Sequence, residues 1–79
     1  MKIKNKYTET ITAGVVTTHY EFYDGSEVAT TKNYRFSDMP RFWIVTKDET
    51  GKILKEFEVE TEIELSEYVE KYENSSPTK

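Results

Sequence analysis

Apolar and polar residues alternate along most of the first 60 positions, with breaks at glycine, aspartate or proline. Alternation with a period of two is typical of strands that bury one face. The segments that show it are residues 3–11, 15–23, 27–36, 41–47 and 52–60. Because short turn sequences separate them, the pattern predicts a five-stranded, mainly antiparallel sheet built from consecutive hairpins.

The register of the first hairpin follows from the apolar positions. A two-residue turn at positions 13–14 places Ile11 opposite Val16 and Tyr7 opposite Tyr20. This register puts the apolar side chains of both strands on one face. We therefore predict that Tyr7 and Ile11, like Ile3 on the same parity, face the core.

The second hairpin contains Asp24-Gly25, a strong turn signal. A two-residue turn at this point would place Tyr20 and Val28 on opposite faces of the sheet. A three-residue loop with Gly25 in the left-handed conformation keeps them on one face, so we predict that loop.

The segment 41–47 is apolar on both parities, and it follows a break at Ser37 to Pro40. Phe42 and Ile44 share one face of the predicted strand, and Trp43 and Val45 share the other. A strand that is covered on both faces has this composition. We expect Phe42 and Ile44 to belong to the core.

A four-residue turn at 48–51 joins this strand to the last one. The predicted pairs are Phe42–Phe57 and Thr46–Ile53 on the core face, and Val45–Leu54 and Arg41–Glu58 on the opposite face. Both apolar and oppositely charged residues are matched in this register.

The remaining segment has a helical pattern. Thr61 and Glu64 form a capping-box sequence. Apolar residues then follow at helical spacing, at Leu65, Tyr68, Val69 and Tyr72. We predict a helix over 62–73 that packs on one face of the sheet, which makes an α+β domain; the alternative continues the last strand through Leu65 and begins the helix at Ser66.

The chain length and composition limit the classes of protein. With 79 residues we expect one domain over 1–73 and a disordered tail over 74–79. The absence of cysteine fits a reducing compartment, and no apolar run approaches the roughly 18 residues of a membrane span, so we expect a soluble, unprocessed cytoplasmic protein. The net charge is −4, but residues 1–47 carry +2 and residues 48–73 carry −7.

Catalytic and metal-binding motifs are weak. His19 is the single histidine, and its neighbours on the polar parity are threonines and Glu21, which are ordinary residues of an exposed sheet surface. Without cysteine, metal ligands reduce to glutamates at 56–64, which lack the calcium-loop spacing. We expect neither an enzyme nor a metal or cofactor site.

Charge suggests one class of partner and argues against another. The basic residues near the N-terminus are few, and the acidic total argues against direct nucleic-acid binding. A row of carboxylates could instead imitate a phosphate backbone and inhibit a nucleic-acid-binding enzyme, as small phage-type inhibitors do. That alternative acidic face, flanked by Glu56 and Glu58, consists of Glu62, Glu64, Glu67, Glu70 and Glu73; its competing interpretation is a solvated helix face.

A partner-binding patch is predicted on the second face of segment 41–47. An aromatic residue in a small apolar patch with a charged rim is typical of protein interfaces. The predicted residues are Trp43, Val45, Leu54, Arg41, Glu56 and Glu58. We predict a small, non-enzymatic protein-binding module that occupies a partner's surface; the competing possibilities are that the helix or the connection 37–40 covers Trp43, or that a homodimer buries the patch.

Overall fold

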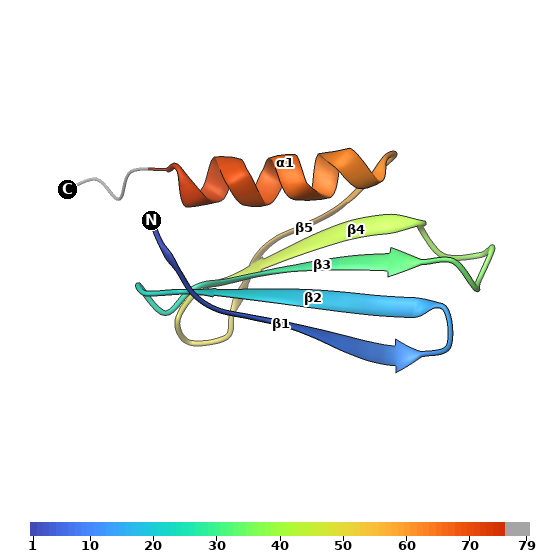
Figure 1. Cartoon of the computed structure of the whole chain (residues 1–79), viewed down its shortest axis with the longest axis horizontal. Coiled ribbons are helices and arrows are strands. Elements are labelled where there is room, and N and C mark those ends of the chain that lie inside the picture. Colours follow the sequence, from blue (N-terminus) through green and yellow to red (C-terminus); the bar gives the residue numbers. More distant parts are fainter. Residues whose placement is uncertain (76–79) are drawn as a thin grey trace.

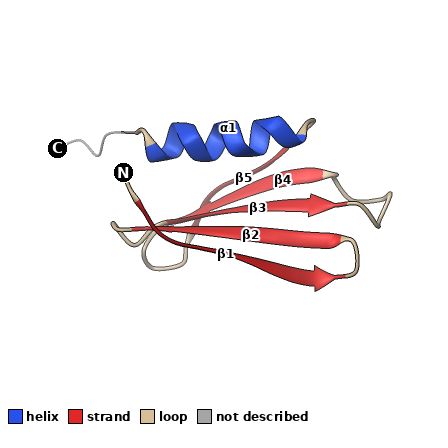
Figure 2. Cartoon of the chain, in the orientation of Figure 1, coloured by secondary structure: helices blue, strands red, loops and turns tan. Residues whose placement is uncertain are grey.

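The computed structural model describes residues 1–75 and has two layers, an antiparallel sheet and one helix (Figure 1). The elements are β1 (Ile3–Thr12), β2 (Val15–Phe22), β3 (Glu27–Asn33), β4 (Phe42–Lys47), β5 (Ile53–Val59) and α1 (Glu62–Glu73). The strands are ordered β1-β2-β3-β4-β5, and α1 packs on one face of the sheet (Figure 2). The predicted α+β class is confirmed, while residues 76–79 of the predicted tail lie outside the described residues.

The core lies between α1 and the sheet face that carries Phe42 and Ile44, as predicted. The buried apolar cluster consists of Phe22, Val28, Phe42, Ile44, Leu65 and Val69. Two tyrosines of α1 pack at the edge of this cluster, and their hydroxyls form hydrogen bonds with β4 and with the β2–β3 loop. Tyr68 shares a hydrogen bond of 3.0 Å with the Thr46 hydroxyl, and Tyr72 donates one of 2.8 Å to Ser26. Apolar burial and satisfied polar groups thus hold the helix in one orientation.

The start of α1 is set by a complete capping box. Thr61 has extended backbone geometry, and its hydroxyl accepts a hydrogen bond from the Glu64 amide, while the Glu64 carboxylate accepts one from the Thr61 amide. These contacts satisfy helix-end donors that have no partner within the helix. The predicted helix over 62–73 is confirmed, and the alternative start at Ser66 is wrong. Within residues 1–75, no helix is long and apolar enough to cross a membrane.

The first hairpin has the predicted turn but a different register. Thr12 pairs with Val15, as a two-residue turn requires, and Thr10 then pairs with Val16, so that Ile11 is an extra residue in β1. A bulge of one residue reverses the face of every following side chain. Tyr7 consequently pairs with His19, and the prediction that it lies opposite Tyr20 in the core is wrong. Tyr7 and Ile11 are exposed.

A second irregularity in β1 falls between Ile3 and Asn5 and restores the original parity. Ile3 pairs with Phe22 and packs against the core cluster, as expected. The two bulges therefore turn only the central part of this edge strand away from the predicted face.

The second hairpin confirms the predicted three-residue loop. The Phe22 amide donates to the Ser26 carbonyl at 2.9 Å, and Gly25 has a φ of 90°. Tyr20 pairs with Val28, so the even positions of β2 and β3 share the core face. Gly25 supplies a left-handed conformation that other residues adopt at a cost.

The third strand ends at Asn33, and its predicted continuation to residue 36 is wrong. The Asn33 side chain is fully buried, and its oxygen accepts hydrogen bonds from the amides of Arg35 and Phe36 at 3.0 and 2.9 Å. Its amide group donates to the Phe36 carbonyl at 2.8 Å. An asparagine that binds the backbone two and three residues ahead favours a turn over a continued strand.

The last hairpin has a longer loop than predicted. The Asp48 carboxylate accepts hydrogen bonds from the amides of Thr50 and Lys52, and Lys47 pairs with Ile53 across five loop residues. Leu54 is then an extra residue in β5. All four predicted β4–β5 pairs are wrong by two positions: the observed pairs are Phe42–Val59, Trp43–Glu58, Ile44–Phe57, Val45–Glu56 and Thr46–Lys55. A shift of two leaves each of the β5 side chains beyond the bulge on its predicted face.

Candidate functional site

The sheet face opposite α1, here called the back face, carries two rows of side chains that cross the strands. Side chains at directly paired positions lie on the same face of a sheet. One row contains Tyr7, His19, Ala29, Val45 and Glu56, and the next contains Glu9, Thr17, Thr31, Trp43 and Glu58. The β4 residues of the two rows are Trp43 and Val45. Each lies between a small residue of β3 and a carboxylate of β5.

Trp43 and Val45 are half-buried, and Glu58 and Glu56 lie directly opposite them on β5. A shallow groove of about 390 Å³ borders Trp43 and is also lined by Met39, Pro40, Glu56, Phe57 and Glu58. The connection before β4 therefore flanks the indole and leaves part of it accessible. Four of the six predicted site residues are brought together here.

The other two predicted residues lie elsewhere. Leu54 is the bulged residue of β5 and lines a groove with Tyr68 and Tyr72 of α1, so its predicted place opposite Val45 is wrong. Arg41 precedes β4, and its carbonyl accepts a hydrogen bond from the Asn33 amide at 2.8 Å. Its guanidinium lies 5.5 Å from the centre of the Tyr34 ring, so its predicted pairing with Glu58 is also wrong.

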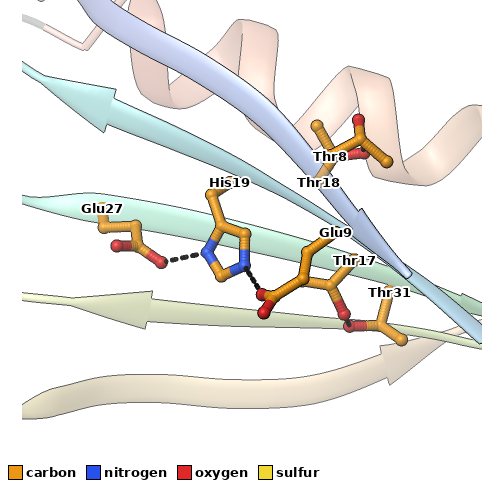
Figure 3. A network of polar contacts seen from close by, with 7 residues as sticks. All are labelled: Thr8, Glu9, Thr17, Thr18, His19, Glu27 and Thr31. Atoms are coloured by element: carbon orange, nitrogen blue, oxygen red, sulfur yellow. Dashed lines mark hydrogen bonds and ion pairs between the residues drawn. The ribbon is translucent and has the colours of Figure 1, made fainter. Parts of the chain in front are cut away.

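The most connected polar group of the back face is His19. Its Nδ1 lies 2.7 Å from a carboxylate oxygen of Glu27 on β3, and its Nε2 lies 3.0 Å from one of Glu9 on β1 (Figure 3). The ring stacks on Tyr7, with centroids 4.7 Å apart and planes 11° from parallel. One imidazole therefore connects three strands.

Both ring nitrogens of His19 face carboxylates, and both can donate only when the ring is protonated. Partial burial lowers the pKa of His19, but the hydrogen bonds that the ring donates to Glu27 and Glu9 outweigh it and raise the pKa above its ordinary value. Neither nitrogen is free to act as a base in this arrangement. Within residues 1–75, no group of three His, Asp or Glu side chains is arranged to hold a metal ion.

Sequence reasoning placed His19 on the polar face but missed its two partners. Glu27 is diagonal to His19 across the β2–β3 pair, and Glu9 reaches it only because the Ile11 bulge shifts β1 by one residue. The odd parity that Glu27 shares with His19 is the one signal that points to a shared face, since the predicted first hairpin places Glu9 on the core face. It does not predict the pairing, because the bulge has no distinct sequence pattern.

The carboxylates of α1 do not form a single row. Glu62 lies 2.6 Å from the Lys32 ammonium on the sheet, and this hydrogen bond lowers the pKa of Glu62 and raises that of Lys32. Glu64 is engaged in the capping box. Glu64, Glu67 and Glu70 line a groove on the side of α1 that faces β5.

Comparisons with known proteins provide no relative: the chain matches no family model, no curated protein and no solved structure. The functional proposal consequently rests on the residues of this chain.

Proposed function

We propose that this chain is a small, non-enzymatic protein-binding module that occupies a partner's surface through its back face. The observation that carries the proposal is the position of Trp43 and Val45, side by side on the sheet face opposite α1 and partly accessible. A partly accessible tryptophan in an apolar patch is the kind of residue that dominates binding energy at interfaces.

Charge defines the kind of partner that fits. Glu9 and Glu27 are paired with His19. Three further carboxylates lie on this face, from Glu21, Glu56 and Glu58. Lys47 of β4 is a cation on the same face, where it pairs with Glu27 of β3. This surplus of negative charge favours a partner surface that carries lysine or arginine around an apolar contact.

The test uses tagged protein and extract of the native host. We compare the unchanged chain with the double variant Trp43→Ser/Val45→Thr and with Ile63→Ser, which removes an apolar side chain that is 67% exposed on α1. Circular dichroism verifies that each variant is folded. We expect that the unchanged chain and the Ile63→Ser variant both capture the same protein from the extract. The double variant should not capture it.

The purified partner then gives a readout at the site. The chain has one tryptophan, so a blue shift of its fluorescence on titration reports burial of Trp43. Calorimetry on the double variant should show affinity reduced by about tenfold or more. An unshifted emission spectrum at saturation would place the interface elsewhere and sink the proposal.

The alternative, an acidic nucleic-acid mimic, has weaker support because Glu62 and Glu64 are engaged within the chain. Its test is charge reversal at Glu67 and Glu70, which would abolish inhibition of a nucleic-acid-binding enzyme. A homodimer through the back face is tested by light scattering, where the Trp43→Ser/Val45→Thr variant would become monomeric.

A further inference from the structure

A second surface lies on the helix side of the sheet, along the edge strand β5. A groove of about 660 Å³ runs between α1 and β5, with Ile44, Phe57 and Val59 among its lining residues. It shares Tyr68 and Lys71 with a neighbouring groove of about 480 Å³, which Leu54 also lines. The two grooves together follow the β5 side of the helix for most of its length.

The edge of β5 presents both apolar side chains and backbone groups. β5 is the last strand of the sheet and pairs with β4 alone among the described elements. Phe57 is 36% exposed and Leu54 is 56% exposed, and the Phe57 ring meets the Tyr68 ring edge to face at 5.3 Å. An edge strand with open hydrogen-bonding groups beside an apolar groove is a template for an added strand.

Carboxylates border this edge on both sides of the sheet. Glu64, Glu67 and Glu70 of α1 line the larger groove on the helix side, where Lys71 is the single cation; Lys55 of β5 lines the smaller groove together with Lys71. Glu56 and Glu58 pair with Val45 and Trp43 and so lie on the back face. A strand added to β5 would therefore meet negative charge on both of its faces.

The opposite edge of the sheet has the reverse charge. Lys4 and Lys6 of β1 and the preceding Lys2 are exposed at that edge, and lysine at an edge discourages pairing with a further strand. A basic segment would be repelled from β1 and attracted to β5. The charge distribution thus selects one of the two edges.

We propose that β5 and the adjoining groove bind an extended, basic segment of a partner protein, which adds to the sheet as a sixth strand. The regular part of β5, residues 55–59, has room for about five paired residues. On the helix side, the segment places an apolar or aromatic anchor against Phe57 and Tyr68, with lysine or arginine reaching Glu67 and Glu70. On the other side, its basic residues face Glu56 and Glu58.

The probe is a synthetic peptide, Thr-Lys-Lys-Phe-Lys-Lys-Thr, acetylated and amidated at its ends. Its phenylalanine and two lysines share one face, and the remaining two lysines share the other. A second peptide has glutamate in place of each lysine. A third keeps every side chain of the first but is N-methylated at its third and fourth residues, which removes backbone donors of both parities.

Nuclear magnetic resonance measures binding to the full chain at low salt, where we expect shifts in the amides of residues 55–59 and in the Tyr68 ring. The double variant Glu67→Lys/Glu70→Lys should bind the lysine peptide at least tenfold more weakly. The control Asp38→Lys/Glu49→Lys changes the net charge equally at exposed loop positions and should bind much more tightly than the first variant. The glutamate and N-methylated peptides should not shift β5.

Three results would overturn the proposal. Equal weakening in both double variants would mean that net charge alone attracts the peptide. Binding of the N-methylated peptide with unchanged affinity would exclude strand addition. Concentration-dependent shifts at β5 without peptide, together with a doubled mass in light scattering, would assign this edge to a second copy of the chain, whose basic β1 is the competing occupant. Tyr68 lines the groove between α1 and β5, whereas Glu56 and Glu58 border Trp43 on the back face, so the Tyr68 ring shift is the signal that is specific to this site.

Discussion

The Nδ1 atom of His19 and a carboxylate oxygen of Glu27 lie 2.7 Å apart across the β2–β3 pair. Glu9 approaches the other ring nitrogen from β1, so the protonated ring connects the edge strand to the centre of the sheet. This contact is the most specific electrostatic feature of the back face, and it makes the stability of the sheet depend on pH.

We predict that the free energy of unfolding falls as pH rises from 6 to 9. The hydrogen bonds that the ring donates to Glu27 and Glu9 raise the pKa of folded His19 despite its partial burial. A raised pKa stabilises the fold fully below the ordinary value of about 6.5, and the contribution is lost as pH rises through the folded-state pKa. Urea unfolding at several pH values measures the decrease, which we expect to be of order 1 kcal/mol for a partly exposed network.

The matched control for this pH series is His19→Gln, which has no titrating ring. The difference in unfolding free energy between the unchanged chain and the variant should shrink toward high pH. A difference that stays constant from pH 6 to 9 would contradict a stabilising imidazolium.

Asn33→Ala should destabilise the chain by about 2–3 kcal/mol. The side-chain oxygen of buried Asn33 accepts hydrogen bonds from the backbone amides of Arg35 and Phe36, and its side-chain nitrogen donates one to the Phe36 carbonyl. Removal leaves backbone groups of the connection before β4 without partners, at a cost of about 1–3 kcal/mol for each group that stays buried. Chemical denaturation measures the loss. Asn5→Ala, at an exposed position, should change stability by less than about 0.5 kcal/mol, and equal losses in both variants would refute the role of Asn33.

Thr61→Ala should cost about 1 kcal/mol by removing the hydroxyl of the capping box. Thr61→Ser keeps an oxygen acceptor at the same position and should stay close to the unchanged chain. Thermal unfolding followed by circular dichroism compares the two variants. If serine and alanine have the same effect, the hydroxyl does not cap the helix.

Leu65→Ala should remove about 2–5 kcal/mol, because Leu65 is buried in the core and its truncation leaves a cavity. For so small a domain this loss approaches the whole stability. Ile63→Ala, two residues earlier on the exposed side of the same helix, should change stability by less than about 0.5 kcal/mol. Urea titration distinguishes these outcomes, and similar losses at both positions would mean that α1 packs through a different face.

The division of β4 into two faces is readable from the sequence because side chains of a strand alternate regardless of its partner. Phe42 and Ile44 face α1, and Trp43 and Val45 face away, as the period of two predicts. The capping box similarly defines the helix start from Thr61 and Glu64 alone, since its hydrogen bonds are local. The candidate site on the back face is predictable to the extent that it depends on strand alternation.

Pairing across strands is less predictable, because one extra residue changes it and has no sequence signal of its own. Ile11 and Leu54 are both such residues. The bulge at Ile11 turns Tyr7 out of the predicted core and brings Glu9 to His19, whereas the loop and bulge before residue 55 together shift residues 55–59 by two and preserve their faces. The end of β3 likewise depends on Asn33, whose amide forms its bonds only when the chain has turned back over it.

The sequence by itself determined the five strands, the helix and its cap, and the face on which each β4 side chain lies, because alternation and capping are local properties of the chain. The tertiary structure decided the registers, the bridge from His19 to Glu9 and Glu27, and the removal of Leu54 from the predicted patch. These features depend on how bulges and loops accommodate the packing of distant strands, and the energy of that packing exists only in the folded chain.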